Sequence, residues 1–306
     1  REAKRILSEV EEECGWMYKT VASQQVSSSV VNELADEITS CRSADEIRMK
    51  LAIRNSQLGT INYTVWSDVF VCSECTREVV FWEAAVNKEA GSVRDEFPCP
   101  HCGAMLTKRR MERAWVTRYD SAIKQSIRQA KQVPVLINYS LGKKRFEKTP
   151  DAFDLALIEN IEQLEIPYWF PTDRMPEGYN TEQPKVSHGL THVHHFYTKR
   201  NLWVLGAIRC RMNVPQCLLM FNSQLVNISK LNRYRPEVSF PYNPLSGTLY
   251  IGSQVSEANV FTAYENKISR LLKALDNVKC QTYLFTQSTE HTWIANSTID
   301  YIFTDP

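Results

Sequence analysis

Two C-x-x-C pairs, Cys72-Ser-Glu-Cys75 and Cys99-Pro-His-Cys102, stand 23 residues apart in this chain. Each pair directs two thiolates from one turn toward one point. Two such turns complete the tetrahedral set of four sulfurs that zinc prefers in structural sites. The run 78–82, Glu-Val-Val-Phe-Trp, is typical of a strand beside the first turn. The spacing therefore predicts a zinc ribbon, with Zn²⁺ as a structural cofactor held by these four cysteines.

The chain has nine cysteines, and two other interpretations of the pairs stay open. A redox C-x-x-C would use one pair and leave the other unexplained, and four cysteines can also fall in pairs without a shared role. His101 lies inside the second turn, and with four thiolates present we expect it to stay outside the ligand set. The remaining five cysteines are expected to be small apolar residues. An odd number of cysteines scattered along a long chain suits a reducing compartment, so we predict a cytoplasmic protein.

Length and composition set broad limits. The 306 residues allow one large domain or two ordinary ones. With 36 basic and 35 acidic residues the net charge is +1, so any basic surface for nucleic acid must be local. No apolar run approaches the roughly 18–20 residues of a membrane span, which predicts a soluble protein without a membrane partner. The 10 glycines include no G-x-G pair, so neither a dinucleotide fingerprint nor a P-loop is present.

The charge is unevenly distributed. Residues 107–148 hold twelve Lys and Arg side chains and three Asp and Glu, a local charge of +9. Basic residues beside a zinc ribbon are typical of phosphate binding, although a solvated basic face has the same composition. Two later stretches add basic residues, Thr198–Asn201 before a predicted helix and the aromatic-basic run Lys230–Pro236. The predicted DNA-binding residues are Arg109, Arg110, Lys143, Lys144, Arg145, Lys199, Arg200, Arg233 and Arg235.

Four histidines gather at His188, His192, His194 and His195. Their spacing matches no recognised catalytic geometry, and no carboxylate lies near them in the sequence to orient a ring. Their neighbours are aromatic and apolar, so we expect these rings to pack and hydrogen-bond inside the fold. A place beside a substrate groove stays open, because Thr198–Asn201 follows directly and can meet phosphate at a helix N-terminus.

Hydrophobic periodicity predicts helices alternating with late strands, which indicates α/β architecture. The predicted helices cover residues 1–19, 32–58, 151–165, 198–212, 215–231 and 257–276. Short strands are predicted at 248–251, at 281–286 and within 296–306, in addition to those around the cysteine pairs.

The last residues carry the most specific motif after the cysteines. Asn296-Ser-Thr-Ile-Asp300-Tyr-Ile-Phe-Thr-Asp305-Pro306 reads as a turn, a buried strand and an Asp-Pro at the carboxyl edge of that strand. In open α/β sheets this edge is where chemistry is placed. The motif resembles the approach to the D-P-P-Y/F motif of S-adenosylmethionine-dependent DNA amino-methyltransferases. More widely, the cysteine pairs and residues 118–148, 192–202 and 239–252 resemble large prokaryotic DNA methylases with a zinc-ribbon insertion.

The resemblance implies a function. Asp305 would accept a hydrogen bond from the exocyclic amine of a flipped adenine (N6) or cytosine (N4), and Pro306 would begin the turn that presents a carbonyl to the same nitrogen. S-adenosylmethionine would be the methyl donor, DNA the substrate, and a restriction or defence system a possible partner. The second Pro and the stacking Tyr or Phe of the motif would follow residue 306. The glycine-rich cofactor loop would precede residue 1, so we expect an internal segment of a longer enzyme that is inactive alone.

On this interpretation the fold is α/β and includes part of a Rossmann-like methyltransferase sheet. The chain then divides into four segments. They are a helical segment after the cofactor-binding half (1–58), the zinc ribbon (59–118), a basic and helical insertion that engages DNA (119–236) and a return to the catalytic α/β domain (237–306). Two alternatives remain: a zinc-ribbon nucleic-acid-binding protein without catalysis, and a structural zinc module that mediates protein contacts. The target base and site and the oligomeric state stay open.

Overall fold

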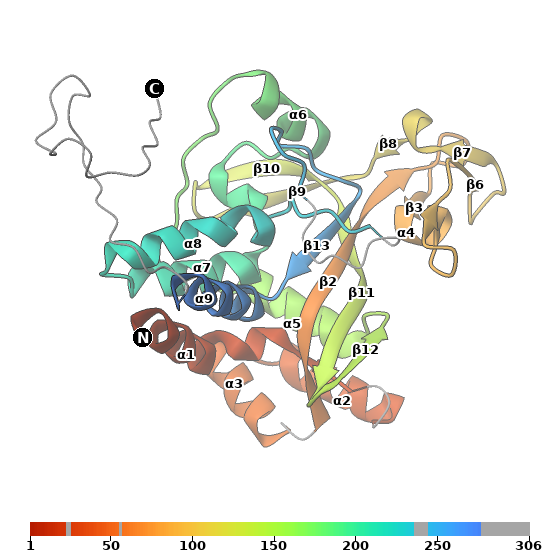
Figure 1. Cartoon of the computed structure of the whole chain (residues 1–306). Coiled ribbons are helices and arrows are strands. Elements are labelled where there is room, and N and C mark those ends of the chain that lie inside the picture. The colour runs from red at the N-terminus through yellow and green to blue at the C-terminus, as the bar shows by residue number, and fades with distance from the viewer. Residues whose placement is uncertain (23–25, 55–56, 236–243, 277–306) are drawn as a thin grey trace, which may run out of the picture. The chain divides into compact units, whose positions relative to one another are not determined.

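The structure, a computed structural model, describes residues 1–22, 26–54, 57–235 and 244–276. Residues Arg1–Ser269 form one compact unit with mixed α and β structure, shown in Figure 1. The predicted mixture of helices and strands is confirmed. The predicted strands at 281–286 and within 296–306 lie outside the described residues.

One long strand, β2 (Leu58–Val71), organises the unit. Along one edge it pairs with β11 (Gln132–Leu141), from Thr60–Ser140 to Asp68–Gln132. Along the other edge it pairs in turn with β1 (Lys19–Val21) and β13 (Gln254–Ala258). A further strand, β12 (Lys144–Lys148), extends the sheet beyond β11.

The upper end of β2 in Figure 1 leaves this sheet and enters the cysteine module. There, Val69–Val71 pairs with β3 (Glu78–Val80), and Phe70 and Val71 also pair with β8 (Glu112–Arg113). The other elements of the module are short: α4 (Phe81–Ala85), β4 (Val86–Asn87), β5 (Ser92–Val93), β6 (Glu96–Pro98), β7 (Met105–Thr107) and the 3-10 turn η3 (Lys108–Arg110). A single strand therefore belongs to both parts of the sheet.

Helices pack on the larger part of the sheet. The N-terminal ones are α1 (Glu2–Cys14), η1 (Gly15–Tyr18), α2 (Ser28–Thr39) and α3 (Ala44–Ile53). The later ones are α5 (Ala152–Gln163), α6 (Tyr179–His188), η4 (Val193–Phe196), α7 (Lys199–Cys210), α8 (Pro215–Ile228) and α9 (Val260–Asp276). Helix α5 starts at a capping box made by Asp151 and Asp154, and it packs on α2.

The structure differs from the expected architecture in two respects. Every strand pair among the described residues is antiparallel, so the parallel sheet of a Rossmann-like fold is not found in this part of the chain. Residues 119–148, expected within the basic and helical insertion, form strands: the end of β9 (Trp115–Asp120), β10 (Gln125–Ala130) and the β11–β12 hairpin. The physical reason is the run Val133–Ile137, whose β-branched residues favour a strand; Pro134 is accommodated where the register with β2 shifts.

Candidate metal centre and nucleic-acid interface

The two C-x-x-C turns have the same backbone conformation. In each turn the first cysteine, Cys72 or Cys99, donates its N–H to the carbonyl five residues later. The residue four positions after that cysteine, Thr76 or Gly103, donates its N–H to the carbonyl of the cysteine. This residue has a positive φ, +59° at Thr76 and +74° at Gly103. This shared turn directs the two thiols of each pair to the same side.

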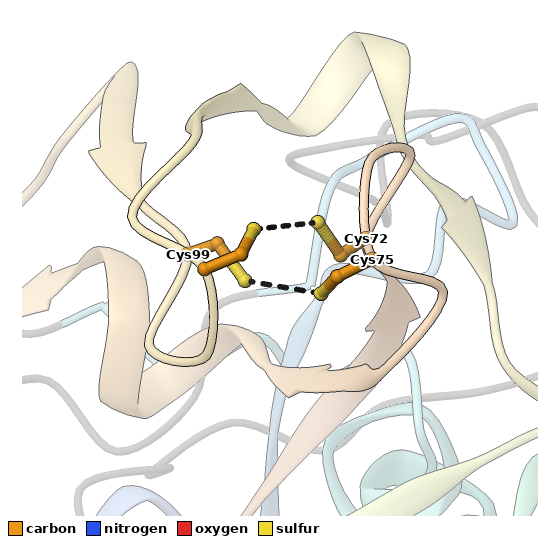
Figure 2. A group of neighbouring side chains, drawn as sticks. Cys72, Cys75 and Cys99 are labelled. Atoms are coloured by element: carbon orange, nitrogen blue, oxygen red, sulfur yellow. Dashed lines mark hydrogen bonds between the residues drawn. The ribbon is translucent and has the colours of Figure 1, made fainter.

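The four sulfurs converge on one point. The Sγ atoms of Cys72 and Cys102 are 3.8 Å apart, as are those of Cys75 and Cys99, and all four lie within 4.8 Å of one another (Figure 2). A tetrahedral ion with Zn–S bonds of about 2.3 Å requires sulfurs about 3.8 Å apart, whereas a disulfide requires about 2.05 Å. The predicted cysteines are therefore brought together in a geometry that fits a structural zinc ion.

The cysteine module surrounds this cluster with apolar side chains. Cys72 and Cys99 are buried among Phe70, Phe81 and Phe97, so one side of the cluster is closed to water. Burial opposes ionisation of Cys99, but hydrogen bonds from the backbone N–H groups of His101 and Cys102 and from the thiols of Cys72 and Cys102 outweigh it and lower the pKa of this thiol to about 7, whereas burial and the same thiol contacts raise the pKa of Cys102. A sulfur that ionises near neutral pH is ready to bind a metal cation.

His101 and the other described cysteines take no part in the cluster. The imidazole Nε2 of His101 lies 2.9 Å from the carbonyl of Glu78. Cys14, Cys41 and Cys217 are buried, as expected of small apolar residues, whereas Cys210 is exposed. Cys280 lies outside the described residues.

A cavity of about 720 Å³ lies beside the cysteine module and brings together two basic groups that are far apart in the sequence. Arg109 and Arg110, in η3, and Arg233 and Arg235 all line it. The cavity is lined by Phe81, Val93, Arg94, Asp95, Glu96, Thr107, Lys108, Arg109, Arg110, Arg233, Tyr234, Arg235, Tyr250, Gly252, Ser253 and Gln254. Six of these side chains are basic and two are acidic, so the lining has a formal charge of +4.

The predicted residues Lys143, Lys144 and Arg145 lie elsewhere. They are exposed at the turn between β11 and β12, where Leu141 pairs with Lys144. This turn is close to Thr60, whereas the cysteine module begins near Phe70. Ten residues of strand separate the two places, a distance of about 34 Å. These three residues therefore form a second basic group, separate from the cavity.

Arg200 was predicted to bind DNA, and the structure corrects this prediction. The residue is 4% exposed, with Nε and Nη2 donating to Glu257 at 3.0 and 2.5 Å. Nη1 donates to the carbonyl of Met17, and Nη2 also donates to Thr64. The physical reason is that Glu257 is itself buried, so the guanidinium is needed inside the fold.

Lys199 is half-buried and donates to the carbonyl of Glu162 at 2.6 Å. Part of the +9 charge of residues 107–148 is likewise used in ion pairs within the fold, by three of its twelve basic side chains. Arg113 pairs with Asp68, Lys131 pairs with Glu78, and Lys148 pairs with both Asp151 and Asp154. The local charge therefore overstates the basic surface that is available to a phosphate.

Asp68, on β2, is a buried carboxylate that sequence analysis did not single out. Arg113 Nε and Gln132 Nε2 donate to it at 2.9 Å, and His188 Nε2 lies 3.2 Å away. Burial opposes its ionisation, but the hydrogen bond with His188 and the charge of Arg113 outweigh burial and lower the pKa of Asp68 to about 2. This carboxylate ties the cysteine module to β11 and to the end of α6.

The histidine cluster does have a carboxylate partner, contrary to expectation. His194 Nε2 and His195 Nε2 lie 2.8 and 2.9 Å from one oxygen of Asp120, at the end of β9 and 74 residues before His194. Thr191 donates its backbone N–H to His195 Nδ1, so Nε2 of that ring carries the proton. Burial lowers the pKa of His195 to about 4, which keeps the ring neutral.

The side chains of Asp120, His194 and His195 are close enough together to suggest a second metal site. A metal on Nε2 of His195 would move the ring proton to Nδ1, where the N–H of Thr191 already points. Metal-bound histidines instead donate their other N–H to an acceptor. The group is therefore better described as the hydrogen-bonded cluster that the sequence predicts.

The predicted catalytic residues Asp305 and Pro306 lie outside the described residues. Across the part of the chain that the structure describes, no helix is long and apolar enough to cross a membrane. Comparison of the chain with protein-family models, with curated proteins and with solved structures gives no match.

Proposed function

We propose that this chain is the DNA-engaging segment of an S-adenosylmethionine-dependent DNA amino-methyltransferase. The methyl-transfer part of the proposal is supported by the sequence motif that ends in Asp305-Pro306. The DNA-binding part is supported by the cysteine module and by the basic cavity beside it. The observation that carries the proposal is that folding brings Arg109 and Arg110 to the same cavity as Arg233 and Arg235.

Electrostatics favours DNA as the partner of this cavity. A lining with a charge of +4 in a chain of net charge +1 concentrates positive charge at one place, which attracts a polyanion. The four-cysteine cluster makes the neighbouring surface rigid, because a structural zinc ion fixes the turns that hold it. Arginines on a rigid surface can meet phosphates without first being ordered.

Replacement of Arg109 and Arg110 by Ala is expected to weaken DNA binding by the 306-residue chain. Each lost phosphate contact lowers the slope of log K against log salt concentration by about 0.9, so the double variant should lower it by about two. Fluorescence anisotropy with a labelled duplex at several salt concentrations measures both quantities. The matched control is Lys4→Ala/Arg48→Ala, which removes two exposed charges from helices α1 and α3. Equal slopes for both variants would contradict the assignment of the cavity.

Methyl transfer needs a separate test in a longer chain that contains this segment. With labelled S-adenosylmethionine and DNA, we expect incorporation of methyl groups at an adenine N6 or cytosine N4. Asp305→Ala should reduce the rate at least about a hundredfold, because the carboxylate is proposed to accept the hydrogen bond of the reacting amine. Cofactor and DNA binding should be retained. DNA binding without methyl transfer in the unaltered longer chain would favour the non-catalytic zinc-ribbon protein instead.

A further inference from the structure

One face of the large sheet points away from helices α5 and α7. A row of paired residues crosses the strands β12, β11, β2 and β13 at Lys148, Ile137, Thr64 and Glu257. The lysine of this row pairs with Asp154 of α5, and its glutamate pairs with Arg200 of α7. The neighbouring row consists of Glu147, Asn138 and Tyr63. Because side chains alternate along a strand, this second row lies on the opposite face, away from the two helices.

Side chains on this face join the turn between β11 and β12 to the basic cavity. Arg145 is exposed and shares the face, because it stands two residues before Glu147 on β12. The carboxylate of Glu147 accepts a hydrogen bond from the hydroxyl of Tyr63 at 3.2 Å. The ring of Tyr63 lies beside the ring of Tyr234, with centroids 6.3 Å apart, and Tyr234 lines the cavity. The turn and the cavity therefore lie on the same face of the sheet.

Both ends of this face carry basic side chains that are accessible to solvent. The exposed residues are Lys143, Lys144 and Arg145 at the turn, and Arg109 and Arg110 at the cavity. None of these five is ion-paired with another described residue. Between the two ends lies the acidic Glu147, which accepts hydrogen bonds from Tyr63 and Asn138 at 3.2 and 3.1 Å. These bonds offset part of its charge, so the two ends stay attractive to an anion that passes between them.

The separation of the two basic groups matches the helical repeat of DNA. The turn lies at the lower end of the sheet in Figure 1, near Thr60, and the cysteine module with Arg109 and Arg110 begins at Phe70. About ten residues of extended strand separate the two places, a distance of about 34 Å. B-form DNA makes one turn in about 34–36 Å, or about 10 base pairs. Phosphates one turn apart on a strand therefore face the same side of the duplex at this separation.

We propose that one DNA duplex lies along this face and contacts both basic groups at points about one helical turn apart. Arg109 and Arg110 bind phosphates at one point, and the turn residues 143–145 bind phosphates at the other. The proposal rests on the proposed DNA binding and adds a second contact region and a minimum duplex length of about ten base pairs. A shorter duplex reaches only one group at a time, so it loses the gain in affinity that two linked contacts provide.

The test compares the 306-residue chain with the variant Lys143→Ala/Lys144→Ala/Arg145→Ala on a duplex of about twenty base pairs and on a hairpin stem of about eight. On the long duplex the variant is expected to lose at least about tenfold in affinity, and the slope of log K against log salt concentration should fall by about 2.7. On the short stem its affinity should change by no more than about twofold, because only one group can bind at a time. Fluorescence anisotropy at several salt concentrations measures both quantities. The matched control, Lys4→Ala/Arg42→Ala/Arg48→Ala, removes the same charge from exposed positions and should leave both slopes unchanged.

The other outcomes separate this proposal from the proposed function. If the unaltered chain binds neither DNA, both fail. If Arg109→Ala/Arg110→Ala weakens binding but the turn variant binds the long duplex as the unaltered chain does, the DNA-binding proposal stands and the two-point contact is overturned. An equal loss on both lengths also overturns it, since the turn would then contact DNA without the one-turn separation.

A measurement on the unaltered chain decides the matter if the turn variant folds poorly. Ethylation of single phosphates in the long duplex shows which of them the protein needs for binding. Two groups of phosphates about ten base pairs apart on one side of the duplex support the proposal, and a single group overturns it.

Discussion

Zinc removal is expected to destabilise this protein more than any single substitution on its surface. Purified chain should contain about one zinc ion per molecule, and a strong chelator should lower the free energy of unfolding by several kcal/mol. The reason is that four thiolates within 4.8 Å of one another repel when no cation joins them. Binding of structural zinc to short peptides contributes about 10–16 kcal/mol near neutral pH. Elemental analysis and thermal unfolding with and without chelator measure the two effects.

Substitution of a ligand should reproduce the effect of the chelator. Cys99→Ser removes a buried ligand and should lower both the zinc content and the melting temperature, whereas Cys210→Ser, at an exposed cysteine outside the cluster, should change neither. A well-folded sample with a metal-to-protein ratio near zero would contradict the zinc assignment.

Arg200→Ala is expected to cost about 3–5 kcal/mol of stability, a large part of the total for most domains. The substitution leaves Glu257 buried with two hydrogen bonds, from Trp66 and Thr198, and without its cation. Arg200→Lys should also destabilise, because one ammonium cannot replace three guanidinium nitrogens that donate to four acceptor atoms on Glu257, Met17 and Thr64. Urea unfolding at neutral pH gives the free energies directly.

Two further variants check this explanation. Arg209→Ala, on the same helix but half-exposed, should change stability by no more than about 0.5 kcal/mol. Replacement of both partners, Arg200→Met/Glu257→Leu, should cost less than Arg200→Ala, because no unpaired charge is then left inside. A double variant whose loss of stability equals the sum of the losses for Arg200→Met and Glu257→Leu measured separately would show that the two residues act independently.

The features predicted well from sequence are those whose signal is local. Within each pair the two cysteines are separated by only two residues, and the turn that each pair requires is encoded in those few residues. Helix α5 likewise has its apolar periodicity and its cap within residues 151–163. Such features need no knowledge of what packs against them.

The features that could not be predicted depend on partners distant in the sequence. Arg200 reads as a phosphate-binding residue at a helix start until Glu257 is seen to meet it, 57 residues later. Asp120 precedes His194 by 74 residues, so its role in the histidine cluster has no local sign. The cavity could not be predicted for the same reason, because nothing in the sequence near Arg109 indicates that Arg233 lines the same cavity.

Strand β2 connects the four-cysteine cluster to the rest of the sheet. Residues Val69–Val71 belong to the cysteine module, and the preceding residues of the same strand hold β11, β1 and β13. A ligand that binds the native state stabilises everything that unfolds together with its site. With zinc as that ligand, the supply of metal in the cell would set how much of the whole protein escapes degradation. The amount of protein in the cell, and not only the local order of the cysteine module, would then depend on the supply of zinc.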